Sequence, residues 1–270
     1  MTKHLFRPHF TGASKVAKRS ESFLETDLAL AKHVNVHTIN LDDKIISAEI
    51  SMHGRDCITE WGNDLAVIPD LAATPAFKEM IQRLGYKKRI VPTGFYSEGG
   101  LYVFGKEFRL ISDEFESESK LFGEAAEGLP VHFIPGLSSG RHIDCDYQII
   151  DSLKLIYVSH NVAVSESESI FRDRKPKSKI EEIANLYGYE VREYPTYFAD
   201  VPKGPQSISE SLKRLKGINF ILVNETLLTS SIHPDEKEYL KKRGLEAVVI
   251  PLGDVAPGAG LRCMYGEFNT

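Results

Sequence analysis

Three side chains of this chain could together carry out covalent catalysis. They are the carboxylate of Glu98, the imidazole of His142 and the thiol of Cys263, and each lies in a glycine-bearing stretch. A thiol, an imidazole and a carboxylate are the set that a nucleophilic mechanism needs, provided that they meet in one place. The local sequence alone also allows a second interpretation, because a single cysteine after a turn of small residues is often simply buried.

A spacing that recurs four times gives a reason why these stretches should converge. Each time, a helix-like segment is followed by Gly, an apolar-rich run and Pro, with Gly seven residues before Pro. Gly favours the left-handed position that closes a helix. Pro has no N–H to donate and is expected to end a largely buried strand. The four pairs are Gly85 and Pro92, Gly128 and Pro135, Gly188 and Pro195, and Gly244 and Pro251.

The repeat predicts an α/β fold with several strands and one helix in each unit. A first unit that ends in a strand at Val34–Ile39 would bring the number to about five. Further strands are expected at residues 65–68, 155–158 and 220–223, with a hairpin over residues 101–111. Such repeats in one chain favour a closed, radial arrangement in which each unit buries its neighbour's flank. No internal linker divides the chain, so residues 1–270 are expected to form one domain. Loops that follow equivalent strands would then emerge on the same side.

Composition narrows the class of protein. Hydrophobic residues make up 42% of the 270 residues and charged residues 26%, which is ordinary for a globular protein. The net charge of −5 argues against a nucleic-acid surface. No apolar run approaches the roughly 20 residues that span a bilayer, and the start has no apolar signal-peptide core. Three cysteines without short spacing fit neither a disulfide framework nor a metal motif, so a cytoplasmic location is expected.

Four short motifs, in order along the chain, carry a resemblance to a known family. They are Trp61-Gly62-Asn63-Asp64, Glu98-Gly99-Gly100, His142-x-Asp144 and Gly-Ala-Gly-Leu-Arg-Cys263-Met. Each motif is weak alone, but the ordered series resembles the guanidine-modifying enzymes, which include arginine and agmatine deiminases, dimethylarginine dimethylaminohydrolase and the amidinotransferases. The resemblance implies a five-bladed α/β propeller with pseudo-fivefold symmetry, in agreement with the repeat.

The resemblance also implies a role for each matching residue. Cys263 matches the nucleophile, His142 the general acid and base, and Glu98 the acidic residue beside the histidine. Asp64 and Asp144 match the carboxylates that grip the guanidinium of the substrate. The implied reaction passes through a thiouronium intermediate to a ureido product, with neither cofactor nor metal.

Two departures from the family pattern leave the substrate open. Leu101 stands where the family often has Asp after Glu-Gly-Gly, and Arg262 stands where a His often precedes the cysteine. The chain has the length of the compact dimethylargininase-like members, yet His-x-Asp is more similar to the deiminases and amidinotransferases. Arg141 and Arg262 flank site positions, so either could bind a substrate carboxylate or serve as a structural arginine.

Other functions and roles stay open at this point. An amidinotransferase would pass the amidino group to an amine instead of water, and a propeller of this kind can also be a non-catalytic binding protein. The presence of the whole Cys, His and acidic set counts against the latter. Asp64 could instead cap a turn, and Glu98 could be a solvated turn residue. The oligomeric state is open, with a homodimer as one state that fits, and no ligand spacing predicts a metal.

Overall fold

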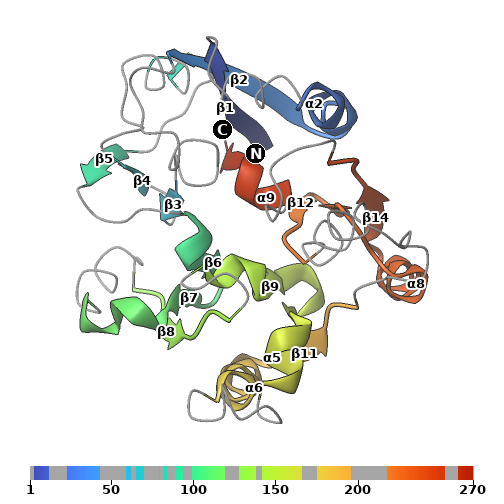
Figure 1. Cartoon of the computed structure of the whole chain (residues 1–270). Helices are drawn as coiled ribbons and strands as arrows, with labels where there is room; N and C mark the ends of the chain where they lie inside the picture. Colours follow the sequence, from blue (N-terminus) through green and yellow to red (C-terminus); the bar gives the residue numbers. More distant parts are fainter. Residues whose placement is uncertain are drawn as a thin grey trace, which may run out of the picture.

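The computed structural model resolves the chain into small sheets and peripheral helices. It describes residues 3–11, 23–42, 59–61, 65–69, 79, 82–83, 89–93, 99–118, 128–137, 142–165, 175–195, 218–252 and 261–269. Within these ranges the strands form five sheets of three strands each. The sheets surround a common centre, and the two chain ends lie close together (Figure 1). The α/β class that the sequence predicted is therefore confirmed.

All five sheets have the same topology, with a first strand antiparallel to a middle strand and the middle strand parallel to a third. Four of them use strands consecutive in the chain: β3 (Thr59–Trp61), β4 (Leu65–Pro69) and β5 (Arg89–Thr93); β6 (Tyr102–Phe104), β7 (Arg109–Ser112) and β8 (Val131–Ile134); β9 (Tyr147–Ile150), β10 (Leu155–Val158) and β11 (Glu190–Glu193); β12 (Ile221–Val223), β13 (Thr226–Thr229) and β14 (Glu246–Val249). The fifth joins both ends of the chain, with β15 (Gly266–Asn269) against β1 (Lys3–Thr11) and β1 against β2 (Asn35–Asp42). The C-terminal strand therefore closes the ring of sheets.

Helices connect the parallel strands on the outside of the ring. Among the described helices the longer ones are α2 (Leu24–Leu30), α6 (Pro176–Tyr187) and α8 (Pro234–Lys242), and each lies between the second and third strands of its sheet (Figure 1). Gly188 (φ 69°) directly follows α6, and Gly244 (φ 84°) follows Arg243 at the end of α8. These left-handed positions confirm the helix-closing role that the repeat predicted for glycine. Gly85 lies outside the described residues.

The prediction for the proline of each repeat needs correction. Pro135, Pro195 and Pro251 do follow their strands, but Pro92 lies inside β5 and pairs with Ile68. A third strand is the outer edge of its sheet, so Pro there need not interrupt a ladder. For the same reason β11 and β14 are not largely buried, and both have exposed positions along their length.

Neighbouring sheets share their hydrophobic cores. One cluster joins the β6–β8 and β9–β11 sheets through residues such as Phe108 and Ile156. A second joins β9–β11 to β12–β14 through Tyr157 and Phe220. A third extends from β12–β14 to the closing sheet and includes Tyr265 beside a short helix, α9 (Leu261–Met264). At these three junctions, neighbouring sheets bury each other's flanks, as the repeat predicted. This packing holds α9 near the centre of the ring (Figure 1).

A largely buried ion pair connects the segment after α9 to the sheet formed by β15, β1 and β2. The Arg7 guanidinium donates to both carboxylate oxygens of Asp27, at 3.0 Å from Nε to Oδ1 and 2.5 Å from Nη2 to Oδ2. The hydroxyl of Tyr265 donates to the same carboxylate over 2.6 Å. Burial, reinforced by Asp27, raises the pKa of Tyr265 well above its ordinary value. Since Tyr265 lies two residues after Cys263, the network helps to position α9.

We expect Arg7→Leu to lower the free energy of unfolding by up to about 3 kcal/mol, because it leaves a largely buried carboxylate without its cation. The side chains of Arg7 and Asp27 are only 5% and 14% exposed. Urea unfolding measures the loss. Arg83→Leu is the matched control, because Arg83 pairs with Glu79 on the surface and its loss should cost less than about 1 kcal/mol. Equal effects from the two variants would contradict the prediction.

Candidate active site

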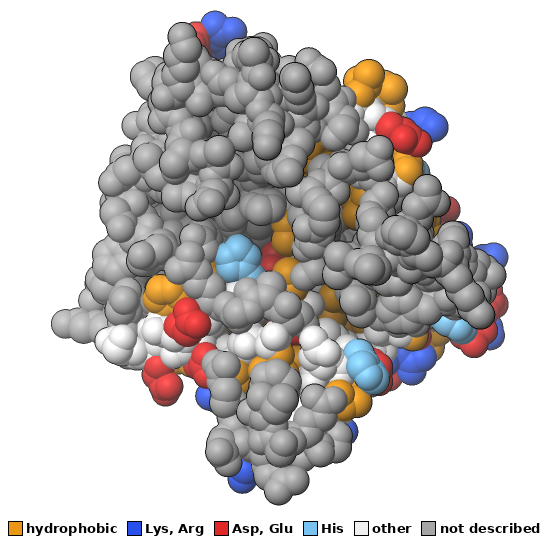
Figure 2. All heavy atoms as spheres, viewed as in Figure 1, with side chains coloured by type: hydrophobic (Ala, Val, Ile, Leu, Met, Phe, Trp, Pro, Cys, Tyr) orange, Lys and Arg blue, Asp and Glu red, His pale blue; other side chains and the backbone are white. Residues whose placement is uncertain are grey.

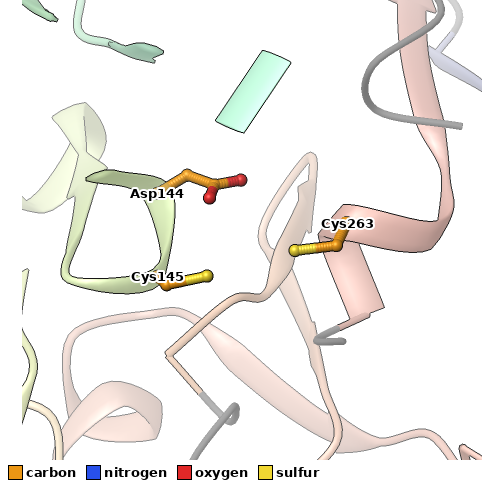
Figure 3. Close-up of side chains that lie close together, drawn as sticks. All are labelled: Asp144, Cys145 and Cys263. Atoms are coloured by element: carbon orange, nitrogen blue, oxygen red, sulfur yellow. The ribbon is translucent and has the colours of Figure 1, made fainter. Parts of the chain in front are cut away.

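Asp144, Cys145 and Cys263 form a compact, buried cluster. Asp144 and Cys145 come from a short 3₁₀ helix, η4 (Ile143–Cys145), and Cys263 comes from α9. One carboxylate oxygen and the two sulfur atoms all lie within 4.8 Å of one another. Figure 3 shows the two thiols pointing toward each other, with the carboxylate of Asp144 alongside. Thus η4 and α9, far apart in the chain, bring the predicted nucleophile to one of the predicted guanidinium-binding carboxylates.

The carboxylate of Asp144 lacks a partner within the described part of the chain. The residue is fully buried, and neither carboxylate oxygen has a hydrogen-bond partner among the described groups. A buried carboxylate without hydrogen bonds is costly, and native structures pair such charges or bind cations with them. The cluster therefore has the electrostatic character of a cation-binding site beside a thiol.

Two buried amide side chains fix the distance between η4 and α9. The Asn219 side chain accepts a hydrogen bond from the Cys263 N–H (2.8 Å) and donates one to the Asp144 carbonyl (3.2 Å). Gln148 donates to the same carbonyl (2.8 Å) and accepts from the Arg262 guanidinium. The sequence interpretation missed both amides. The one available signal was Asn219 itself, a polar residue within the apolar run 218–223.

We expect Asn219→Ala to destabilise the protein by about 1–3 kcal/mol, because it leaves the buried Cys263 N–H without its acceptor. A shift of α9 by as little as about 1 Å could also reduce the rate of a reaction at Cys263 by about 10²-fold. Urea unfolding and kcat measure the two effects. Asn185→Ala, an exposed position on α6, is the matched control and should change stability by less than about 0.5 kcal/mol. If the two variants behave alike, Asn219 does not position the cluster.

His142 lies at the start of η4 and packs closely against Gly100. A Cβ atom placed on Gly100 would lie 2.6 Å from Nδ1 and 2.8 Å from Cγ of the His142 ring. Only glycine allows this approach without displacing the ring. The 3₁₀ helix Gly99–Leu101, which directly follows Glu98 in the sequence, therefore reaches His142. A histidine side chain also lies near the middle of the face shown in Figure 2, beside apolar side chains.

The structure does not describe every residue of the predicted site. Asp64, Glu98 and Arg141 lie outside the described residues, although Asp64 directly precedes β4 and Arg141 directly precedes His142. Arg262 is described, and its guanidinium contacts Gln148. Its Nε lies 2.9 Å from Oε1 of Glu267, close enough for an ion pair but not aligned as a hydrogen bond. A role for Arg262 toward a substrate carboxylate stays a prediction.

The cluster also has ligand types that Zn²⁺ binds in proteins. Two thiolates and a carboxylate are groups that Zn²⁺ accepts, and three protein ligands are common in catalytic zinc sites. The sequence analysis predicted no metal, and the expectation that the site works without a metal stays a prediction.

Comparison with known proteins identifies the fold. No family model and no curated protein sequence matches the chain. Solved structures do match along nearly its whole length, and they show that the chain shares the fold of guanidine-modifying enzymes, such as dimethylarginine dimethylaminohydrolase and agmatine deiminase, as the ordered motifs predicted.

Three of these structures define the similarity. Dimethylarginine dimethylaminohydrolase from Pseudomonas aeruginosa, complexed with citrulline, is 14% identical, with a TM-score of 0.57 over 99% of this chain and 100% of that one. Agmatine deiminase from C. jejuni is 15% identical, with a TM-score of 0.61 over 98% and 92%. The N-terminal domain of ArgZ, a cyanobacterial arginine dihydrolase, bound to product, is 12% identical, with a TM-score of 0.59 over 99% and 97%. At these identities, the property that the chains share is the fold.

Proposed function

We propose that this protein is a hydrolase that acts on a guanidino compound through Cys263. One observation carries the proposal: the buried carboxylate of Asp144, with no hydrogen-bond partner among the described groups, lies within 4.8 Å of the Cys263 thiol. The carboxylate favours a cationic ligand, and the thiol needs an electrophilic carbon next to its sulfur. A guanidinium has both properties. The five equivalent sheets further support a five-bladed α/β propeller with the site at its centre.

The guanidinium would satisfy the groups that the fold leaves in need of a partner. Its planar donors form a rigid fork that can bind a carboxylate at two points, which fixes the orientation of the substrate. Asp144 would provide one such contact and Asp64 the other. The bound cation would also favour the thiolate of Cys263, which is the reactive form.

The proposed reaction has two stages. The thiolate of Cys263 attacks the guanidinium carbon, and the tetrahedral adduct expels ammonia or an amine as His142 protonates the departing nitrogen. A thiouronium remains on sulfur. His142 then acts as a base and removes a proton from water, which attacks the same carbon and releases the ureido product and the thiolate. Glu98 would hold the imidazole in the orientation and charge that both steps need.

Hydrolysis is favoured over amidino transfer by the names of the matching structures. They include a dimethylaminohydrolase, a deiminase and a dihydrolase, and one of them holds citrulline, which is a ureido compound. Amidino transfer stays the second enzymatic alternative. A non-catalytic binding protein would have no need for a thiol beside a buried carboxylate.

A screen for ureido product tests the proposal. The purified protein is incubated with arginine, methylated arginines, agmatine and guanidino acids, and ureido product is measured by colorimetry and mass spectrometry. Added glycine or lysine separates the two enzymatic functions, because a transferase forms amidinated amine only when an acceptor is present. Absence of both kinds of product with every substrate would overturn the enzymatic proposal.

The acidic end of the substrate is proposed to meet Arg141 or Arg262. Arg262 already contacts Gln148 and Glu267, so a substrate carboxylate there would have to compete with Glu267. Agmatine lacks the carboxylate that arginine carries. A kcat/KM for arginine at least about 10-fold above that for agmatine would support such a contact, since about 1.4 kcal/mol corresponds to that factor.

The remaining expectations concern context. None of the described helices has the length and apolar character needed to cross a bilayer. A single domain over residues 1–270, a cytoplasmic location, a homodimeric state, and the absence of nucleic-acid partners and cofactors stay predictions.

A further inference from the structure

The second thiol of the cluster has no part in the proposed reaction. Cys145 follows Asp144 in η4, and its side chain is 4% exposed, whereas Cys263 in α9 is 8% exposed. Neither cysteine forms a disulfide. Their sulfur atoms nevertheless lie within 4.8 Å of each other and point toward one another (Figure 3). Packing alone does not require a thiol at Cys145, because a small hydrophobic side chain would fill the same space.

We propose that Cys145 and Cys263 form a modification site, a thiol pair that a peroxide converts into a disulfide. A disulfide needs sulfur atoms about 2.05 Å apart, and rotation of cysteine side chains between staggered positions moves sulfur through much of the remaining distance. The side chain of Asn219 hydrogen-bonds both the Cys263 N–H and the Asp144 carbonyl. These bonds hold η4 and α9 close together beside the two sulfur atoms, so the disulfide would not require the two segments to approach.

The chemistry balances with a peroxide as the oxidant. The Cys263 thiolate attacks one peroxide oxygen and forms a sulfenic acid, while the other oxygen leaves as hydroxide. The Cys145 thiolate then attacks the sulfenic sulfur, forms the S–S bond and expels a second hydroxide. Overall, two thiols lose two hydrogens and two electrons, and hydrogen peroxide becomes two molecules of water. A resolving thiol of this kind stops oxidation at a reversible stage, before the sulfinic acid forms.

Two consequences distinguish the pair from an isolated reactive cysteine. The disulfide occupies Cys263, so under the proposed function it would switch activity off, and a thiol reductant would restore it. The bond itself can be detected by mass whether or not the protein is a guanidino hydrolase. Its failure and the failure of the proposed function are therefore distinguishable.

The test uses the full chain, reduced, freed of reductant and treated with hydrogen peroxide at mildly alkaline pH, where more thiol is ionised. Intact mass should fall by two hydrogen atoms in the monomer. Peptide mapping without reduction should link the Cys145 peptide to the Cys263 peptide. Dithiothreitol should return the original mass. Cys57→Ser is the matched control, and it should form the same link.

Cys145→Ser should give no link and should instead gain two oxygen atoms at Cys263, which dithiothreitol does not remove. Cys145→Ala serves the same purpose if the serine variant does not fold, as judged by circular dichroism. The proposal is overturned if the unmodified protein gains oxygen at Cys263 without a link, if it stays unoxidised, or if Cys57 or a second chain supplies the partner sulfur.

Discussion

Replacing Cys263 by serine should lower the rate of ureido product formation by at least about 10³-fold. Serine keeps the size of the side chain and the backbone bond to Asn219, but a hydroxyl is a far weaker nucleophile than a thiolate at neutral pH. Loss of a catalytic nucleophile can reduce kcat by up to about 10⁶-fold, so the expected effect is far outside the range of a packing change. Steady-state assays with the best substrate of the screen measure it.

The Cys263→Ser variant should lose catalysis but keep substrate binding. Asp144 remains in place, so the Cys263→Ser protein should still bind the guanidino substrate, as measured by calorimetry. Cys145→Ser is the matched control, because its thiol lies in the same cluster but has no proposed catalytic step; it should keep kcat within about 10-fold. A Cys263→Ser protein with near-normal turnover, or a larger loss in Cys145→Ser, would show that the nucleophile has been misassigned.

Gly100→Ala is expected to lower kcat by about 10²-fold with little change in the overall fold. The new methyl group would lie 2.6 Å from Nδ1 of His142, well inside van der Waals contact, so the ring has to move. A misplacement of about 1 Å in a group that transfers protons can cost about this factor. The pH dependence of kcat should change as well, because the displaced imidazole meets different neighbours.

Gly105→Ala controls for the loss of a glycine on the same segment. Its Cβ would meet Cδ1 of Ile149 at 3.2 Å and Oδ1 of Asp151 at 3.3 Å, so these atoms need to shift by only a few tenths of an ångström. Activity should therefore stay within a few-fold of the unchanged protein, and urea unfolding should show whether either variant is destabilised. Full activity in Gly100→Ala would mean that the imidazole of His142 does not need its observed position.

Local physics made much of the fold predictable. Gly188 and Gly244 adopt left-handed backbone angles at helix ends because a side chain is costly there, and that preference is visible in sequence. The exception was Pro92, which lies within a strand. Whether Pro interrupts a ladder depends on which edge of the strand is paired, and only the sheet order decides this.

Part of the candidate site was predictable from the sequence, and part of it was visible only in the tertiary structure. The sequence by itself determined the α/β repeat and predicted that glycine-bearing stretches with Glu98, His142 and Cys263 converge, because helix ends, apolar runs and residue types are properties of short segments. Only the tertiary structure decided that Asn219 bridges η4 and α9, and that Cys145 faces Cys263. The physical reason is distance along the chain. Packing of complete sheets, and not a preference within any one segment, sets which buried amide or thiol meets which partner.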